Sequence, residues 1–162
     1  MNMDRRAILG RGGLAIAGLA SFRWPAGAFA ANERFAVVHS PAEWRRILGP
    51  QRYEILREAG TERAFTSPLN GEHHVGVFSC AGCAQALFAS ATKFDSGTGW
   101  PSFWRPLPRA IITRADSSMF LMRTEVLCSR CGSHVGHVFD DGPKPTGLRY
   151  CMNGLALLFR PA

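Results

Sequence analysis

The chain has 162 residues, of which 46% are hydrophobic, and a formal net charge of +7. This length indicates one domain once any targeting segment is removed. Apart from the pairs Arg5-Arg6 and Arg45-Arg46, the basic residues are scattered and form no run that could follow a phosphate backbone, so we expect no nucleic-acid partner.

Residues 1–30 have the pattern of an export signal. Arg5 and Arg6 precede a mild apolar stretch, and Ala28-Phe29-Ala30 fits the A-x-A pattern of a cleavage site. The arginine pair favours the twin-arginine route over the unfolded-chain secretory route. The apolar stretch is too short and glycine-rich to span a bilayer, and the alternatives to cleavage are an uncleaved anchor or a disordered tail.

Cleavage after Ala30 would leave a mature domain of residues 31–162. Removing residues 1–30 takes away four arginines and one aspartate, which lowers the net charge from +7 to +4. We expect this domain to be periplasmic, without stable membrane insertion after cleavage.

Residues 40–59 have a helical pattern in two parts. The segment "SPAE" beginning at Ser40 has the form of a capping box with proline at the first helical position. Gly49-Pro50 should interrupt the helix, and Gly60 should end the second part. The inward positions are predicted to be Trp44, Ile47 and Leu48, followed by Tyr53 and Leu56.

Beyond residue 70 the pattern changes to short strands separated by clusters of Gly, Pro, Asp and Ser. The candidate strands are His74–Ser79, Ala110–Arg114, Met119–Val126 and Tyr150–Phe159. The sequence therefore predicts a mainly β fold, with two small antiparallel sheets packed together and short N-terminal helices covering one edge.

Two C-x-x-C pairs predict a metal site. Thiolates two residues apart on a tight turn can reach one ion, and two such turns complete a tetrahedral shell for one structural zinc ion. A closed shell has no open position for chemistry. Because exported proteins also form disulfides, reactive C-x-x-C disulfides are the alternative. The predicted ligands are Cys80, Cys83, Cys128 and Cys131.

Cys151 stands apart from these pairs, in the segment "RYCMN". A reactive cysteine needs nearby positive charge or hydrogen-bond donors to become a thiolate, and Arg149 and Asn153 lie two positions to either side. On a strand, period two places these three side chains on one face. Tyr150 and Met152 would then point into packing.

Two histidines and a tryptophan are predicted to complete the pocket. His134 and His137, in "SHVGHVF", are expected to line it with Cys151 and to transfer protons near neutral pH, the alternative being a role as zinc ligands. Trp100 lies at a predicted loop tip between a glycine and a proline. Its indole would offer an apolar wall to a small methyl group.

Four segments together resemble the B-type methionine sulfoxide reductases: "GTERAF", "CAGCAQALF", "KFDSGTGWPSFW" and "CSRCGSHVGHVFDDGPKPTGLRYCMN". The resemblance covers about Trp44 to Phe159. It implies reduction of methionine-R-sulfoxide in oxidised proteins and peptides, on a fold of two antiparallel sheets with a four-cysteine zinc site. It further implies that Cys151 is the nucleophile, that Trp100 seats the substrate methyl group, and that the polar network consists of His134, His137, Asp141, Arg149 and Asn153.

The sequence departs from the family pattern at Thr98. Many members have a second cysteine there, in "SGCGWPSF", which resolves the oxidised nucleophile as a disulfide. With the other four cysteines assigned to zinc, we expect recycling by an external reductant, either a small thiol or a thioredoxin-like protein.

Two other functions are alternatives to sulfoxide reduction. A zinc-ribbon binding module without catalysis would need a basic or aromatic surface stripe, and the sequence shows none. A Cys-His hydrolase would need an oxyanion-hole element near the histidines, and none is evident.

Overall fold

The computed structural model describes residues 35–118 and 122–162. The predicted signal at residues 1–30 lies outside the described residues, as does the start of the predicted strand at residues 119–121. Arg34–Ala162 forms one compact unit. Within the described ranges, no helix has both the length and the apolar character that a membrane span requires.

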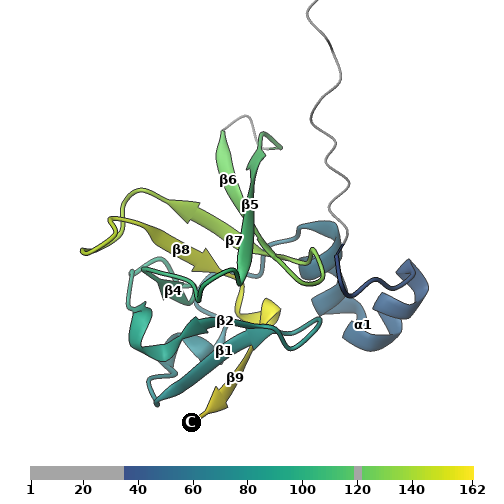
Figure 1. Ribbon diagram of the computed structural model, residues 1–162, viewed down its shortest axis with the longest axis horizontal. Coiled ribbons are helices and arrows are strands. Elements are labelled where there is room, and N and C mark those ends of the chain that lie inside the picture. Colours follow the sequence, from purple (N-terminus) through teal and green to yellow (C-terminus); the bar gives the residue numbers. More distant parts are fainter. Residues whose placement is uncertain (1–34, 119–121) are drawn as a thin grey trace, which may run out of the picture. The chain divides into compact units, whose positions relative to one another are not determined.

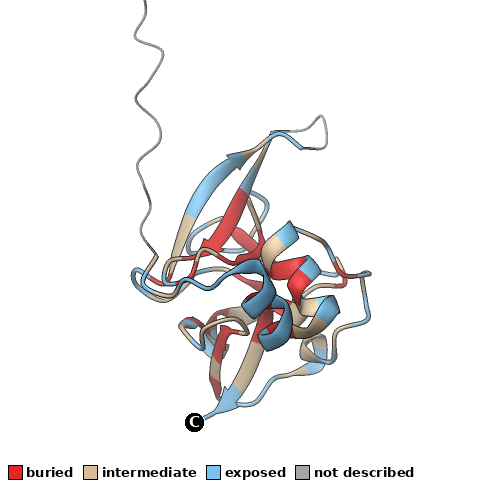
Figure 2. Cartoon of the chain, turned by 90° about the vertical axis from the view of Figure 1, so that its right-hand side faces the viewer, coloured by how far each residue is buried: buried red, intermediate tan, exposed pale blue. Residues whose placement is uncertain are grey.

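Helix α1 spans Pro41–Glu58 and contains the predicted kink. The Glu43 N–H donates to the Ser40 hydroxyl, and the Glu43 carboxylate accepts from the Ser40 N–H at 2.8 Å, which confirms the capping box. Gly49 has φ 69° and ψ 173°, and Pro50 follows it, so the helix consists of two parts as predicted. Its inward face, seen in Figure 2, buries Trp44, Leu48, Tyr53, Ile55 and Leu56.

Two details of the helix prediction were wrong. Ile47 is 45% exposed, because Trp44 and Leu48, one turn apart, occupy the centre of the buried stripe and Ile47 lies beyond its border. The helix is capped by Ala59 in the left-handed conformation, at φ 54°, one residue before the predicted Gly60.

The strands form two antiparallel sheets, which confirms the predicted mainly β fold. In Figure 1 the three-stranded sheet β2-β1-β9 lies at the bottom, below the six-stranded sheet β3-β4-β8-β7-β6-β5. The first sheet contains β1 (Gly76–Cys80), β2 (Ala86–Ala89) and β9 (Leu157–Pro161). The second contains β3 (Lys93–Phe94), β4 (Ser102–Phe103), β5 (Ile111–Asp116), β6 (Arg123–Cys128), β7 (His134–Phe139) and β8 (Arg149–Met152).

The single strand predicted over Tyr150–Phe159 is instead two strands, one in each sheet. β8 and β9 are separated by the short 3-10 helix η3 (Gly154–Ala156). The Glu62 carboxylate accepts the N–H groups of Gly154 and Leu155, so these donors do not join a strand ladder. The remaining 3-10 helices are η1 (Pro68–Gly71) and η2 (Ser90–Thr92).

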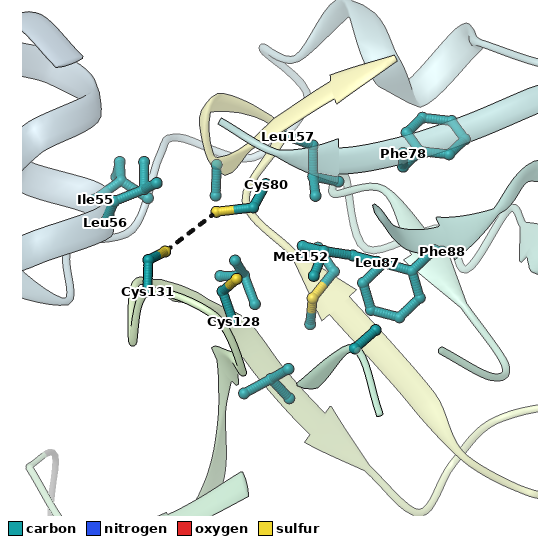
Figure 3. Close-up of a cluster of buried hydrophobic side chains, with 14 of the residues drawn as sticks. Ile55, Leu56, Phe78, Cys80, Leu87, Phe88, Cys128, Cys131, Met152 and Leu157 are labelled. Atoms are coloured by element: carbon teal, nitrogen blue, oxygen red, sulfur yellow. Dashed lines mark hydrogen bonds between the residues drawn. The ribbon is translucent and has the colours of Figure 1, made fainter. Parts of the chain in front are cut away.

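Aromatic side chains from both sheets form the core between them. Phe103 of β4 packs on Phe78 of β1 and Phe88 of β2, with ring centroids 4.9 Å and 4.4 Å apart. Figure 3 shows Phe88 beside Leu87 and Met152, the latter on β8. Met152 therefore belongs to the core, as predicted, and Tyr150 contacts Phe88 in the same cluster.

Candidate active site

The two C-x-x-C pairs meet at the junction of the sheets. Cys80 ends β1 in one sheet and Cys128 ends β6 in the other, and both are fully buried. Each pair forms the same turn: Ala84 and Gly132, four residues after the first cysteine, have φ of 59° and 67° and donate to the carbonyl of that cysteine. Figure 3 shows Cys80 and Cys131 pointing toward each other.

The dimensions of this cluster suit a tetrahedral ion. All four sulfurs lie within 4.8 Å of one another, with 3.8 Å between Cys80 and Cys131 and 3.6 Å between Cys83 and Cys128. A zinc–thiolate bond of about 2.3 Å gives a regular tetrahedron with edges of about 3.8 Å. The 3.8 Å and 3.6 Å approaches each join a cysteine of one C-x-x-C pair to a cysteine of the other, whereas the disulfides considered from the sequence would join the two cysteines of one pair. The donor set therefore fits a closed zinc shell, and neither His134 nor His137 is part of it.

Cys151 lies on β8 between two hydrogen-bonded neighbours. It is paired with Ser102 of β4 on one side and with His137 of β7 on the other. Its sulfur lies 3.8 Å from the Thr98 hydroxyl, which contacts Ser96 at 2.8 Å, and Ser96 contacts Ser102 at 2.7 Å. A chain of three hydroxyl groups therefore lies beside the thiol.

Burial and hydrogen bonding act in opposite directions on Cys151. Burial raises the pKa of the thiol above its ordinary value, while the Thr98 hydroxyl, the charge of Arg149 and the Ser102 hydroxyl lower it in part. The resting group is therefore mainly a thiol at neutral pH. The surrounding charge and hydroxyl donors can stabilise the thiolate once it forms.

Arg149 is held in place by an ion pair. Its guanidinium makes two bonds of 2.8 Å to the Asp141 carboxylate and lies 4.4 Å above the Phe139 ring. Arg149 is buried, whereas Asp141 is largely exposed in the turn between β7 and β8. Asp141 thus orients Arg149 and is not itself placed at the sulfur.

The two histidines have different surroundings. His137 lines the cavity at Cys151 and bonds through Nε2 to Asp116 at 2.8 Å. His134 is 3% exposed, bonds to Glu125 at 2.7 Å and lines a neighbouring cleft that also includes His137, and it is not among the residues that line the Cys151 cavity itself. Burial lowers the pKa of His134, whereas bonds from Ser118, His137 and Arg123 hold the pKa of Asp116 well below its usual range.

A β-bulge explains why the two rings nevertheless lie near each other. The register between β6 and β7 shifts between Val126 and Leu127, opposite the segment from His134 to Gly136. In a regular strand, side chains three positions apart lie on opposite faces, and one extra residue between them places them on the same face. The ring centroids of His134 and His137 are accordingly 5.3 Å apart.

The cavity at Cys151 has a volume of about 120 Å³. Pockets for drug-sized ligands hold about 300–1,000 Å³, so this cavity suits the end of one side chain. Trp100 forms part of its wall, as predicted, and its indole N–H donates to the Glu62 carbonyl at 3.1 Å. The lining residues are Thr61, Trp100, Arg123, Gly136, His137, Phe139, Cys151, Met152 and Asn153.

Comparison with known proteins shows the family. The model of the SelR domain matches residues 48–161. The chain belongs to the SelR domain family. A Peptide methionine sulfoxide reductase MsrB from Thiobacillus denitrificans is 56% identical over 121 residues, which is 74% of this chain and 92% of that relative. Relatives of the same name from Methanosarcina barkeri and Agrobacterium fabrum are each 52% identical and cover 77% and 75% of this chain, and 89% and 91% of their own lengths.

The SelR segment contains several residues around Cys151 to which the sequence assigned no role. Asp116 and Arg123 are directly opposite each other on β5 and β6 and are joined at 2.7 Å, an opposite-charge cross-strand pair. Phe139 packs under Arg149. Glu62, within "GTERAF", contacts both Trp100 and Asn153. No periodic pattern pointed to these residues, because each acts through a partner on another strand or loop.

Proposed function

We propose that this SelR-family chain is a peptide-methionine (R)-S-oxide reductase of exported proteins. The observation that carries the proposal is Cys151, which lies outside the four-cysteine cluster, in a cavity sized for one side-chain end and walled by Trp100. The names of relatives about half identical to this chain support sulfoxide reduction. The signal-like residues 1–30 support a periplasmic location.

The first step transfers oxygen from substrate to cysteine. The Cys151 thiolate attacks the sulfoxide sulfur, with the substrate methyl group seated against Trp100. Attack forms a bond between the two sulfurs, and the protonated oxygen then moves to the Cys151 sulfur as that bond and the sulfur–oxygen bond of the sulfoxide break. Methionine leaves with a sulfur reduced by two electrons, and Cys151 becomes a sulfenic acid, oxidised by two electrons. Arg149 stabilises the thiolate, and Asn153 at the cavity wall orients the substrate.

His137 supplies the proton for the departing oxygen. Asp116 is ionised and can only accept, so Nε2 of His137 carries the hydrogen of their 2.8 Å bond and Nδ1 is left as the nitrogen that transfers a proton. His134 and Glu125 lie behind this pair, and His134 supports the ring of His137 rather than reaching the substrate.

One zinc ion would be held by Cys80, Cys83, Cys128 and Cys131 and would have a structural role, because four thiolates complete a tetrahedral shell. These thiols are therefore withdrawn from the reaction. An external thiol attacks the Cys151 sulfenic acid, water leaves, and a mixed disulfide forms. A second thiol then releases Cys151.

A stereochemical assay tests the proposed function. With dithiothreitol as reductant and racemic dabsyl-methionine sulfoxide as substrate, the R epimer at sulfur should be consumed and the S epimer should remain. Chiral chromatography of the residual substrate measures both. Consumption of the S epimer alone would exclude the assignment, and conversion of neither would leave a non-catalytic zinc module as the better description.

Thr98 leads to a prediction about the oxidised intermediate. One turnover without reductant should leave a sulfenic acid on Cys151 that dimedone labels, because a hydroxyl at position 98 cannot form a disulfide. Mass spectrometry should show one label per chain on Cys151. In Thr98→Cys the label should be largely lost and an internal disulfide found, since the Thr98 oxygen already lies 3.8 Å from Cys151 and a disulfide needs about 2.05 Å. A wild-type disulfide between Cys151 and a zinc cysteine would contradict external recycling.

A further inference from the structure

Glu62 is a buried carboxylate that the reaction scheme does not use. It is 8% exposed and lies in the loop between α1 and η1. Among residues 35–118 and 122–162 it forms no ion pair. A buried charge without a cation is costly unless hydrogen bonds satisfy it. The hydrogen-bond partners of Glu62 therefore indicate its role.

The carboxylate holds the chain directly after the Cys151 strand. One oxygen accepts from the Gly154 N–H and the other from the Leu155 N–H, the latter at 3.0 Å. These are the first two residues of η3, whose preceding residue Asn153 makes no side-chain cap. Glu62 therefore supplies the cap from a distant loop, with charge-assisted bonds that are stronger than neutral ones.

The backbone of the same residue contacts both sides of the Cys151 cavity. Its carbonyl accepts from the Trp100 indole at 3.1 Å, and its N–H donates to Asn153 Oδ1 at 3.0 Å. Trp100 and Asn153 both line the cavity, and so does Thr61, the neighbour of Glu62. With Oδ1 occupied, Asn153 is left with its amide nitrogen as a donor to the substrate.

We propose that Glu62 is a positioning residue that fixes the substrate seat at Trp100 relative to the strand carrying Cys151. The side chain anchors the loop to η3, and the anchored backbone then holds the indole and the Asn153 amide. This inference rests on the proposed reductase function, because it concerns the seat of the sulfoxide. Displacement of a seat by about 1 Å can cost up to about 100-fold in rate.

The test compares Glu62→Gln with Glu58→Gln, which makes the same chemical change on an exposed carboxylate of α1. Glutamine at position 62 replaces one acceptor oxygen with an NH2 group, a donor that faces a backbone N–H, and removes the negative charge. We expect kcat/KM for methionine-R-sulfoxide to fall about 10- to 100-fold in Glu62→Gln, mainly through KM, and to stay within about twofold in Glu58→Gln. Alkylation of Cys151 by iodoacetamide, which needs no seat, should change less than about twofold.

A double-mutant cycle shows whether Glu62 acts through Trp100. Trp100→Phe removes the indole N–H that bonds to Glu62, so the losses in Glu62→Gln and Trp100→Phe should overlap and the double variant should lose less than their product. Multiplicative losses would overturn the proposal. So would wild-type activity in Glu62→Gln, or a loss of activity accompanied by faster alkylation, which indicates general loosening of the fold.

If Glu62→Gln does not fold, Glu62→Asp, which retracts the carboxylate by one methylene, takes its place in each comparison. An inactive wild type would instead refute the reductase function itself.

Discussion

Cys151→Ser should lower sulfoxide reduction by more than about 1,000-fold, to below detection in the dithiothreitol-coupled assay. A serine hydroxyl has a pKa far above that of a thiol and cannot accept the sulfoxide oxygen as a sulfenic acid. The substitution changes one atom at a half-buried position outside the four-cysteine cluster, so packing and metal binding should persist.

Metal content and thermal unfolding serve as the controls for this variant. Cys151→Ser should bind one zinc per chain and unfold within a few degrees of the wild type. A Cys151→Ser protein that retains a tenth of the wild-type rate would show that another group attacks the sulfoxide, and the proposed mechanism would have to be abandoned.

Cys128→Ser should leave the domain unfolded or severely destabilised at 25 °C. Cys128 is fully buried at the end of β6, and Cys80 and Cys83 flank the turn after β1, so an ion bound by these cysteines would join the two sheets. Binding of structural zinc contributes about 10–16 kcal/mol in small domains, which exceeds or equals a typical unfolding free energy of about 5–15 kcal/mol. Circular dichroism during heating, with zinc measured on the same sample, tests this expectation.

The matched control is the same substitution at Cys151, which removes a thiol without touching the cluster. Prolonged treatment of the wild type with a strong chelator should reproduce the Cys128→Ser unfolding. A protein that is active and fully folded with no bound metal would contradict a structural zinc site.

Local patterns were sufficient to predict the four-cysteine cluster and the kinked helix. The spacing of Cys80 and Cys83 places both thiols on one turn whatever the rest of the fold does, and Gly49 with Pro50 interrupts a helix through backbone chemistry alone. The alternation of side chains along a strand likewise predicted that Tyr150 and Met152 lie in the core.

Features that depend on distant partners were not predictable in this way. The break between β8 and β9 is explained by the Glu62 carboxylate, which lies far away in sequence and takes two backbone donors from the ladder. The different surroundings of His134 and His137 depend on a bulge in β7 and on cross-strand acids, Glu125 and Asp116. A single sequence carries no signal for such pairings.

The position of Cys151 on an inner strand limits how the sulfoxide and the external thiol of the proposed reaction can reach it. Strand β8 is hydrogen-bonded to β4 on one side and to β7 on the other, so the backbone at Cys151 is held from both sides and does not carry the sulfur to a second, distant site. In the proposed reaction, the sulfoxide and the external thiol must therefore reach the same sulfur one after the other. Each reactant therefore blocks the other while it is bound. The proposed turnover then alternates between a complex with the sulfoxide and a complex with the thiol, and no ternary complex forms.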